Sequence, residues 1–165
     1  MTKVFCIGFH KTGTTSLGLA LEQLGFHVCG LRKDLLPALK EKDFHKIFEV
    51  VEKYDAFQDN PWPILFRELD QKFPQSKFIL SHRNANNWVK SCVGHFGAKP
   101  KAMRKFIYGH GAPKGNEITY INTYNSHNVA VRNYFKDRPG DLLEIDMDQL
   151  VEWSSLCQFL DKKIT

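Results

Sequence analysis

A short apolar run that enters a glycine-spaced loop and then a helix is the feature that most constrains how this chain folds. The run is VFCI at residues 4–7, and the loop after it has Gly8 and Gly13 separated by four residues. Beyond the loop, apolar side chains recur at helical spacing until Gly25, at Leu17, Ala20, Leu21 and Leu24. A buried strand, a tight loop and a helix in this order are typical of a parallel sheet covered by helices.

The rest of the chain repeats this alternation. Apolar runs of strand length lie at residues 56–58, 77–80 and 142–145, and helical spacing marks residues 44–51, 65–73, 88–96, 120–134 and 153–160. Residues 97–116 are rich in Gly, Lys and Pro and are predicted to form a long loop. The pattern predicts an α/β fold with three layers, α/β/α, around a mostly parallel sheet. The length predicts a single domain over residues 1–165.

Composition and charge exclude several classes of protein. With 42% hydrophobic and 25% charged residues, the chain has the composition of a folded domain. No run approaches the ~18 apolar residues of a transmembrane helix, so no membrane partner is expected. The formal net charge of +5 suits a phosphorylated small ligand but is too small and too scattered for a nucleic-acid groove.

The four cysteines predict a reducing environment. Cys6, Cys29, Cys92 and Cys157 are far apart and lack the C-x-x-C spacing of metal sites, so neither zinc nor a disulfide framework is expected. Cys92 and Cys157 fall on apolar helical faces and are expected to be buried thiols. No signal peptide is visible at the N-terminus, and we expect a cytoplasmic location.

The loop between the first strand and the first helix is suited to an anion. Glycines let backbone amides approach the ligand, and the helix N-terminus adds its positive dipole. The spacing from Gly8 to Gly13 matches the start of the Walker A pattern, but Thr14 stands where that pattern has lysine, which disfavours a standard ATPase or kinase. A glycine-rich turn without a ligand is the alternative. Five side-chain donors favour a bound phosphate or sulfate instead: Lys11, Thr12, Thr14, Thr15 and Ser16.

Two motifs resemble a known family. The stretch GFHKTGTTSL, from Gly8, is similar to the 5′-phosphosulfate loop of sulfotransferases that use 3′-phosphoadenosine 5′-phosphosulfate (PAPS). The stretch FILSHRNA, from Phe78, is followed by Ser91, eight residues after Arg83. In that family an Arg and a Ser at this spacing bind the 3′-phosphate of the donor. A guanidinium fork and a nearby hydroxyl suit phosphate oxygens on physical grounds as well.

The resemblance extends over most of the chain. Residues 54–61, 108–117 and 124–135 look like the small single-domain branch of the family, which has a P-loop NTPase-like fold. The resemblance implies that PAPS is the donor and that adenosine 3′,5′-bisphosphate is the product left after transfer. Relatives usually continue beyond the last helix, so we expect either a trimmed chain or an open nucleotide site.

Sulfuryl transfer sets the expected roles of the loop residues. The migrating sulfuryl group carries less negative charge than a phosphoryl group. A lysine and loop amides can therefore replace Mg²⁺, and we expect no metal. Lys11 is predicted to neutralise the leaving phosphate. His10 is predicted either to contact donor or acceptor or simply to fill the loop. The phosphosulfate oxygens are assigned to Thr12, Gly13, Thr14, Thr15 and Ser16.

Asp59 is the candidate general base. It follows the predicted strand at residues 56–58 and lies 24 residues before Arg83, where the family places a His or a carboxylate. A carboxylate whose pKa is raised by burial can accept the proton of an acceptor hydroxyl. The alternative is that Asp59, beside Asn60 and Pro61, caps the next helix.

The sequence therefore predicts a PAPS-dependent sulfotransferase that modifies a hydroxyl or amine of a small acceptor. Two alternatives stay open: a nucleotide or small-molecule kinase with a displaced loop lysine, and a nucleotide-binding module without catalytic activity. Tyr120, Tyr124 and His127 share one helical stripe, which is predicted to belong either to the core or to the acceptor pocket. No motif identifies the acceptor or the oligomeric state.

Overall fold

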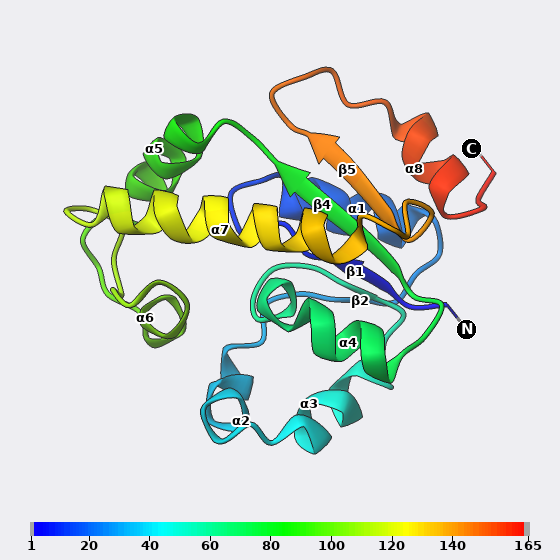
Figure 1. Cartoon of the computed structure of the whole chain (residues 1–165), viewed down its shortest axis with the longest axis horizontal. Coiled ribbons are helices and arrows are strands. Elements are labelled where there is room, and N and C mark those ends of the chain that lie inside the picture. The colour runs from blue at the N-terminus through cyan, green and yellow to red at the C-terminus, as the bar shows by residue number, and fades with distance from the viewer. Residues whose placement is uncertain (1, 164–165) are drawn as a thin grey trace.

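A sheet of five strands forms the middle layer of the protein (Figure 1), in a computed structural model that describes residues 2–163. Its order is β2-β3-β1-β4-β5, and all four pairings are parallel. The predicted parallel sheet is confirmed. The strands are β1 (Val4–Cys6), β2 (Val28–Cys29), β3 (Ala56–Phe57), β4 (Lys77–His82) and β5 (Leu142–Asp146).

One face of the sheet packs against the first and last helices of the fold. Val4 and Cys6 of β1 point to this face, where they join a cluster with residues of α1 (Thr14–Gln23) and α8 (Trp153–Phe159). Leu156 of α8 is almost completely buried there. The period-two alternation of a strand sends the neighbouring side chains to the opposite face.

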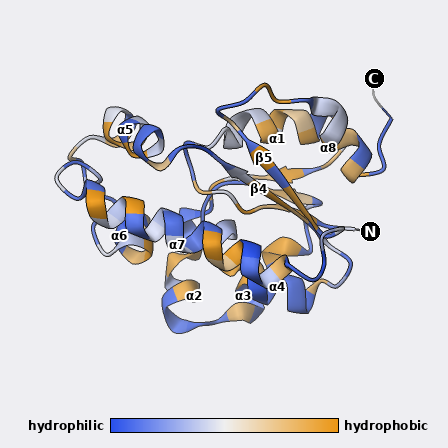
Figure 2. Cartoon of the chain, turned by 45° about the horizontal axis from the view of Figure 1, so that its top comes forward, coloured by the Kyte–Doolittle hydropathy of each residue, from blue (hydrophilic) through white to orange (hydrophobic). Residues whose placement is uncertain are grey.

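The second face carries the larger core. Phe5 of β1 and Ile7, which directly follows β1, pack there with side chains of several helices, including α3 (Phe44–Val51), α4 (Phe66–Lys72) and α7 (Glu117–Phe135). Figure 1 shows α4 and α7 in front of the sheet and α1 behind it, and Figure 2 shows the strands as mostly hydrophobic. Burial of apolar surface on both faces stabilises the predicted three-layer α/β/α architecture, which is confirmed.

An aromatic cluster beyond the sheet corrects one prediction. Residues 97–116 are not a simple loop, because they contain the helix α6 (Ala102–Tyr108), which packs near α5 (Ala85–Phe96) and α7. Tyr108 stacks on Tyr120 with ring centroids 3.9 Å apart, and Trp88 stacks on Tyr124 at 4.2 Å. A seven-residue helix is stabilised by such packing and not by its own length, so its sequence pattern is weak.

Three further elements were not predicted. They are β2, the 3-10 helix η1 (Lys33–Leu35) and the helix α2 (Leu36–Glu41). In addition, a second 3-10 helix, η2 (Trp62–Leu65), directly precedes α4. A two-residue strand is too short to show an alternating pattern.

The position of β1 between β3 and β4 determines where a ligand can bind. From β1 the chain crosses to β2, at one edge of the sheet. From β3 it crosses in the opposite direction, past β1, to β4. The crevice at the carboxyl ends of the strands, where this direction reverses, is the usual ligand site of open α/β sheets.

Candidate functional site

The loop after β1 is shaped by two glycines. A Cβ at Gly8 would clash with the carbonyl oxygen and the hydroxyl of Ser81 on β4, so only glycine lets the two strands approach here. Gly13 is the N-cap of α1 and has a φ of 78°, in the left-handed region that favours glycine. Within the described residues, no side chain caps α1 and its first turn holds no acidic residue. The amides and dipole of this helix end are suited to an external anion.

The side chains of the loop divide between the interior and the surface. Thr12 is fully buried, and its hydroxyl lies 2.5 Å from the carbonyl oxygen of Phe9 and 2.8 Å from the hydroxyl of Ser81. Its side chain therefore ties the loop to β4, and only its backbone is available to a ligand. Lys11 is half-buried and forms no ion pair with any carboxylate of residues 2–163.

The remaining loop residues follow the start of α1. Thr14 is buried, whereas Thr15 and Ser16 are exposed on the first turn. Ser16 also borders a shallow depression between α1 and α8, together with Leu19 and Trp153.

His10 is held firmly in the loop. Its Nδ1 lies 3.3 Å from Nδ2 of Asn60, its Nε2 lies 3.0 Å from the hydroxyl of Tyr108, and its carbonyl oxygen accepts a hydrogen bond from Trp88 at 2.8 Å. Burial, together with the positive charge of Arg104, lowers the pKa of His10 to about 3. His10 is thus a neutral ring at pH 7 that fills the loop and borders a cavity.

Asp59 borders the same cavity from the end of β3. Its Oδ1 accepts a hydrogen bond of 2.7 Å from the amide of Asn60, and burial raises the pKa of its carboxyl group. The following turn, η2, has Pro61 at its N-cap and no side-chain cap from the described part of the chain. The carboxylate therefore faces the cavity and does not cap the next helix.

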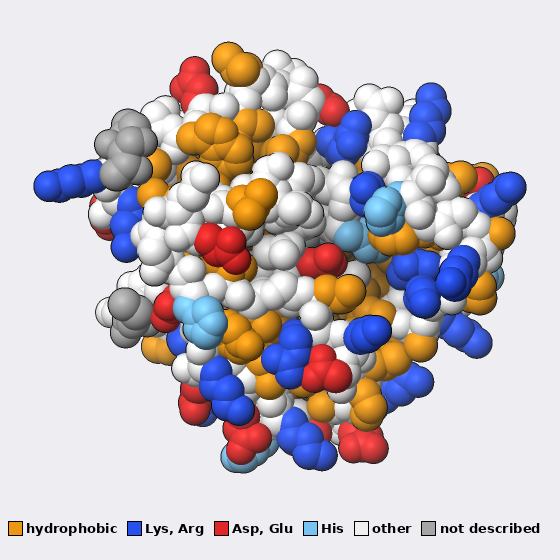
Figure 3. All heavy atoms as spheres, turned by 180° about the vertical axis from the view of Figure 1, so that it is seen from behind, with side chains coloured by type: hydrophobic (Ala, Val, Ile, Leu, Met, Phe, Trp, Pro, Cys, Tyr) orange, Lys and Arg blue, Asp and Glu red, His pale blue; other side chains and the backbone are white. Residues whose placement is uncertain are grey.

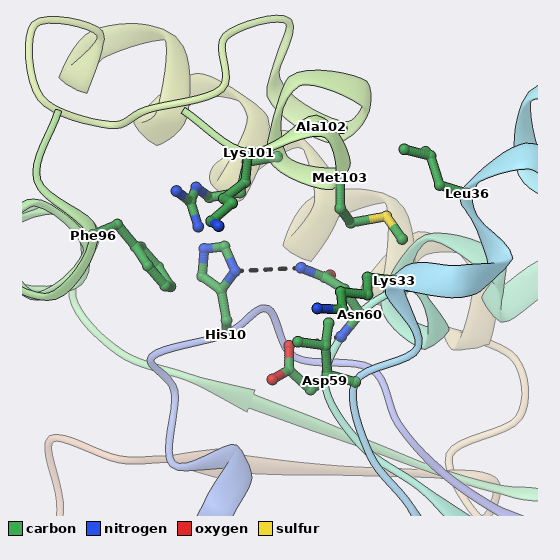
Figure 4. A pocket seen from close by; sticks show the side chains of 11 residues that line it. His10, Lys33, Leu36, Asp59, Asn60, Phe96, Lys101, Ala102 and Met103 are labelled. Atoms are coloured by element: carbon green, nitrogen blue, oxygen red, sulfur yellow. Dashed lines mark hydrogen bonds between the residues drawn. The ribbon is translucent and has the colours of Figure 1, made fainter. Parts of the chain in front are cut away.

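The cavity has a volume of about 460 Å³ and lies between the loop, η1, α2 and α6. Figure 4 shows His10 and Asp59 on one side of it and the residues of α6 on the other. Its walls are largely apolar, with the polar groups gathered near the loop. The lining residues are His10, Leu31, Lys33, Leu36, Asp59, Asn60, Phe96, Lys101, Ala102, Met103 and Arg104.

Arg83 lies at the carboxyl end of β4, next to β1. The hydroxyl of Tyr124 fixes its backbone, because it accepts from the amide of Arg83 at 2.8 Å and donates to its carbonyl oxygen at 2.9 Å. Nε of Arg83 is buried without a hydrogen-bond partner among the residues described, and Oδ1 of Asp148 lies 3.7 Å away. Oδ2 of Asp148 accepts from the amide of Asn84, at the start of α5, at 2.5 Å.

Ser91, the last residue of the second motif, is half-buried on α5, next to the buried Cys92. Burial raises the pKa of the Cys92 thiol to about 12, against the opposing charges of Lys11, Arg104 and Arg83.

The stripe on α7 belongs to the core. Tyr120 and Tyr124 are almost completely buried, and Nε2 of His127 lies 2.7 Å from the carbonyl oxygen of Ile7. The cavity is instead lined from α6 and η1, by side chains that the sequence analysis missed. The only local signal for α6 was the spacing of four residues that joins Met103 to Ile107 and Arg104 to Tyr108.

Residues 2–163 contain no group of three or more His, Cys, Asp and Glu side chains placed to hold a metal ion. Within the same range, no helix is both long enough and apolar enough to cross a membrane.

Comparisons with known proteins identify what the chain is similar to. A family model described as a sulfotransferase domain matches residues 3–110 and 94–165 of the chain. Ava biosynthesis cluster protein M from Aspergillus versicolor is 26% identical over 205 aligned residues, which cover 96% of this chain and 76% of that protein. The first family match includes both the loop after β1 and Arg83.

Proposed function

The chain belongs to the sulfotransferase domain family, and we propose that it transfers a sulfuryl group from PAPS to a hydroxyl or amine of a small acceptor. One observation carries the proposal: two helix N-termini, each beside a cation, follow adjacent strands of the sheet. Lys11 stands before α1 after strand β1, and Arg83 stands before α5 after strand β4. A donor with a 5′-phosphosulfate and a separate 3′-phosphate needs two such anion sites.

The residues of the first site act on the reacting end of the donor. When bound, PAPS supplies a sulfur–oxygen bond that breaks toward the 5′-phosphate while a new one forms to the acceptor oxygen. Lys11 neutralises the charge that develops on the leaving phosphate, and the amides at the start of α1 orient the phosphosulfate oxygens. Asp59 takes the acceptor's proton, for which a pKa raised by burial makes it a stronger base than an exposed aspartate.

The second site holds the other end of the donor. Nε of Arg83 is buried and has no hydrogen-bond partner among the residues that the structure describes, and the amide of Asn84 stands at the N-terminus of a twelve-residue helix. The carboxylate of Asp148 lies beside both groups. The 3′-phosphate is expected to displace Asp148, and Ser91 adds a hydroxyl from the second turn of α5.

Two further features support a cytoplasmic location and a small-molecule acceptor. Cys6, Cys29, Cys92 and Cys157 are free and buried, which favours the reducing cytoplasm. The matched relative is described as a biosynthesis cluster protein, which supports a small-molecule acceptor.

Thermal unfolding with two nucleotides tests the proposal. Adenosine 3′,5′-bisphosphate at ~100 times its dissociation constant should add ~2.7 kcal/mol to the free energy of unfolding. Mg²⁺-ATP should add much less, because Thr14 replaces the phosphate-loop lysine of kinases. A larger effect of Mg²⁺-ATP favours the kinase. Stabilisation by the bisphosphate, without transfer from PAPS to any acceptor, favours a binding module.

A further inference from the structure

We propose that the acceptor is a small hydroxy acid, in which an apolar body carries both the reacting hydroxyl and a carboxylate. This inference rests on the proposed sulfuryl transfer and names the substrate class of the cavity beside Asp59. The volume of about 460 Å³ lies within the range of small-molecule sites. Leu31, Leu36, Phe96 and Met103 give it apolar walls that would hold the body of such a molecule.

The charges around the cavity are unbalanced. Lys33, Lys101 and Arg104 line it, and among residues 2–163 Asp59 is the only carboxylate that does. Neither lysine forms an ion pair within the described part of the chain, and both are exposed. Figure 3 shows Lys and Arg side chains gathered on the side of the molecule that carries α5 and α6.

Arg104 adds an independent observation. Only 8% of this residue is exposed, and among residues 2–163 no carboxylate pairs with its guanidinium. Its Nε donates to the carbonyl oxygen of Gly111 and its Nη2 to that of Lys99, at 2.9 and 2.7 Å, and it lies 4.3 Å above the ring of Phe96. A buried charge without a counter-charge is costly, and an anion in the adjacent cavity lowers this cost.

The placement of the charges also orients the acceptor. In the view of Figure 4, Lys101 and Asp59 lie on opposite sides of His10, and Lys33 lies next to Asn60 on the side of Asp59. Once ionised, Asp59 offsets the charge of Lys33 and repels a carboxylate, which is therefore attracted toward Lys101. The hydroxyl end of the molecule is therefore directed toward Asp59, as proton transfer requires.

Calorimetric titration tests the inference without relying on turnover. The protein is saturated with adenosine 3′,5′-bisphosphate and titrated with para-hydroxyphenylpropionate or its neutral amide, and then with the larger pair 6-hydroxy-2-naphthoate and its amide. At least one acid should bind about tenfold more tightly than its amide, as expected for a charge-assisted contact. The double variant Lys33→Gln/Lys101→Gln should lose most of this preference.

A matched double variant provides the control. Lys40 on α2 and Lys105 on α6 are exposed and lie outside the lining of this cavity, so Lys40→Gln/Lys105→Gln should keep the preference. Equal affinity for each acid and its amide, no binding of either acid, or a preference that survives in the Lys33/Lys101 variant overturns the inference. Failure of the bisphosphate to bind counts against the proposed function instead, and the acids are then titrated into the free protein.

Discussion

The carboxylate of Asp148 lies 3.7 Å from Nε of Arg83, and its second oxygen accepts a hydrogen bond from the amide of Asn84, the N-cap of α5. An anion of the chain itself thus lies where the donor's 3′-phosphate is proposed to bind. The neighbouring Met147 lies against Gly13 at the other proposed anion site. The segment after β5 therefore reaches both ends of the donor site.

Removing the charge of Asp148 is expected to strengthen donor binding. Asp148→Asn keeps an oxygen for the amide of Asn84 but no longer competes with a phosphate for Arg83. Adenosine 3′,5′-bisphosphate should bind about tenfold more tightly, and AMP should bind with unchanged affinity. Calorimetric titration measures both ligands, with Asp141→Asn as a control for a carboxylate that pairs with Arg138. Weaker binding of the bisphosphate would show that Asp148 supports the site.

Lys11→Ala should lower turnover with PAPS by ~10²–10³, because the charge on the leaving phosphate loses its stabilisation. Lys11 has a φ of 63°, a left-handed conformation whose cost lysine and alanine share, so the substitution should leave folding stability almost unchanged. Steady-state kinetics measure the loss of turnover, and a melting curve checks that the fold is intact. Lys40→Ala, which removes an exposed lysine from α2, is the control. Turnover within a few-fold of the unmodified protein would remove Lys11 from the mechanism.

Asp59→Asn should abolish most transfer while raising stability at neutral pH. Burial raises the pKa of Asp59 in the folded state, so ionisation at pH 7 destabilises the fold. Stability is gained as the pH falls through this raised value toward the pKa of the unfolded chain, ~3.9. Asparagine cannot ionise, it tolerates the φ of 68° at this position, and its oxygen can accept from the amide of Asn60. Melting curves at pH 7 and at pH ~3 measure the difference, which should vanish at the lower pH. Normal turnover would exclude Asp59 as the base.

Acid should destabilise the protein through two buried histidines. Burial is the main cause that lowers the pKa of His10 to about 3 and of His127 to about 4. The unfolded chain therefore binds these protons first, and the free energy of unfolding falls below pH ~6.5 until the pH reaches the folded-state values. Each histidine contributes roughly 1.4 kcal/mol per pH unit in that window.

His127→Gln isolates one of these contributions. Glutamine keeps a donor for the carbonyl oxygen of Ile7 but does not titrate. Between pH ~6 and ~4.5, the free energy of unfolding of this variant should fall less steeply with decreasing pH than that of the unmodified protein. The two slopes should differ by roughly 1.4 kcal/mol per pH unit, the contribution of one proton. Urea titrations across this range measure the slope, and His45→Gln on the surface is the control, since His45 is exposed. Equal slopes for His127→Gln and the unmodified protein would contradict a buried neutral His127.

Local patterns sufficed for the layers and for the loop after β1, since apolar runs such as residues 77–80 alternate visibly between the two faces. They did not suffice where distant segments decide the structure. The side chain of Thr12 points into the interior because its hydroxyl contacts Ser81 on β4. The carboxylate beside Arg83 belongs to Asp148, which follows the distant strand β5. The helix α6 depends on the packing of Tyr108 against Tyr120.

Arg83→Ala provides the sharpest test of the second anion site. A nucleotide with only a 5′-phosphate places no charge near Arg83, so adenosine 3′,5′-bisphosphate should bind the unmodified protein more tightly than AMP. The difference should be about 1.5–3 kcal/mol for each charge-assisted contact to the 3′-phosphate. Arg83→Ala should remove most of it and leave AMP binding unchanged.

The fold should survive this substitution, because Tyr124 contacts only the backbone of Arg83 and α5 keeps the side-chain cap of Asn84. Arg132→Ala, which removes a surface arginine paired with Glu144, is the matched control and should leave both affinities unchanged. Calorimetric titration of both nucleotides into the three proteins gives the comparison. Equal affinity of the unmodified protein for the two nucleotides would refute the assignment of Arg83, since the 3′-phosphate would then contribute nothing to binding.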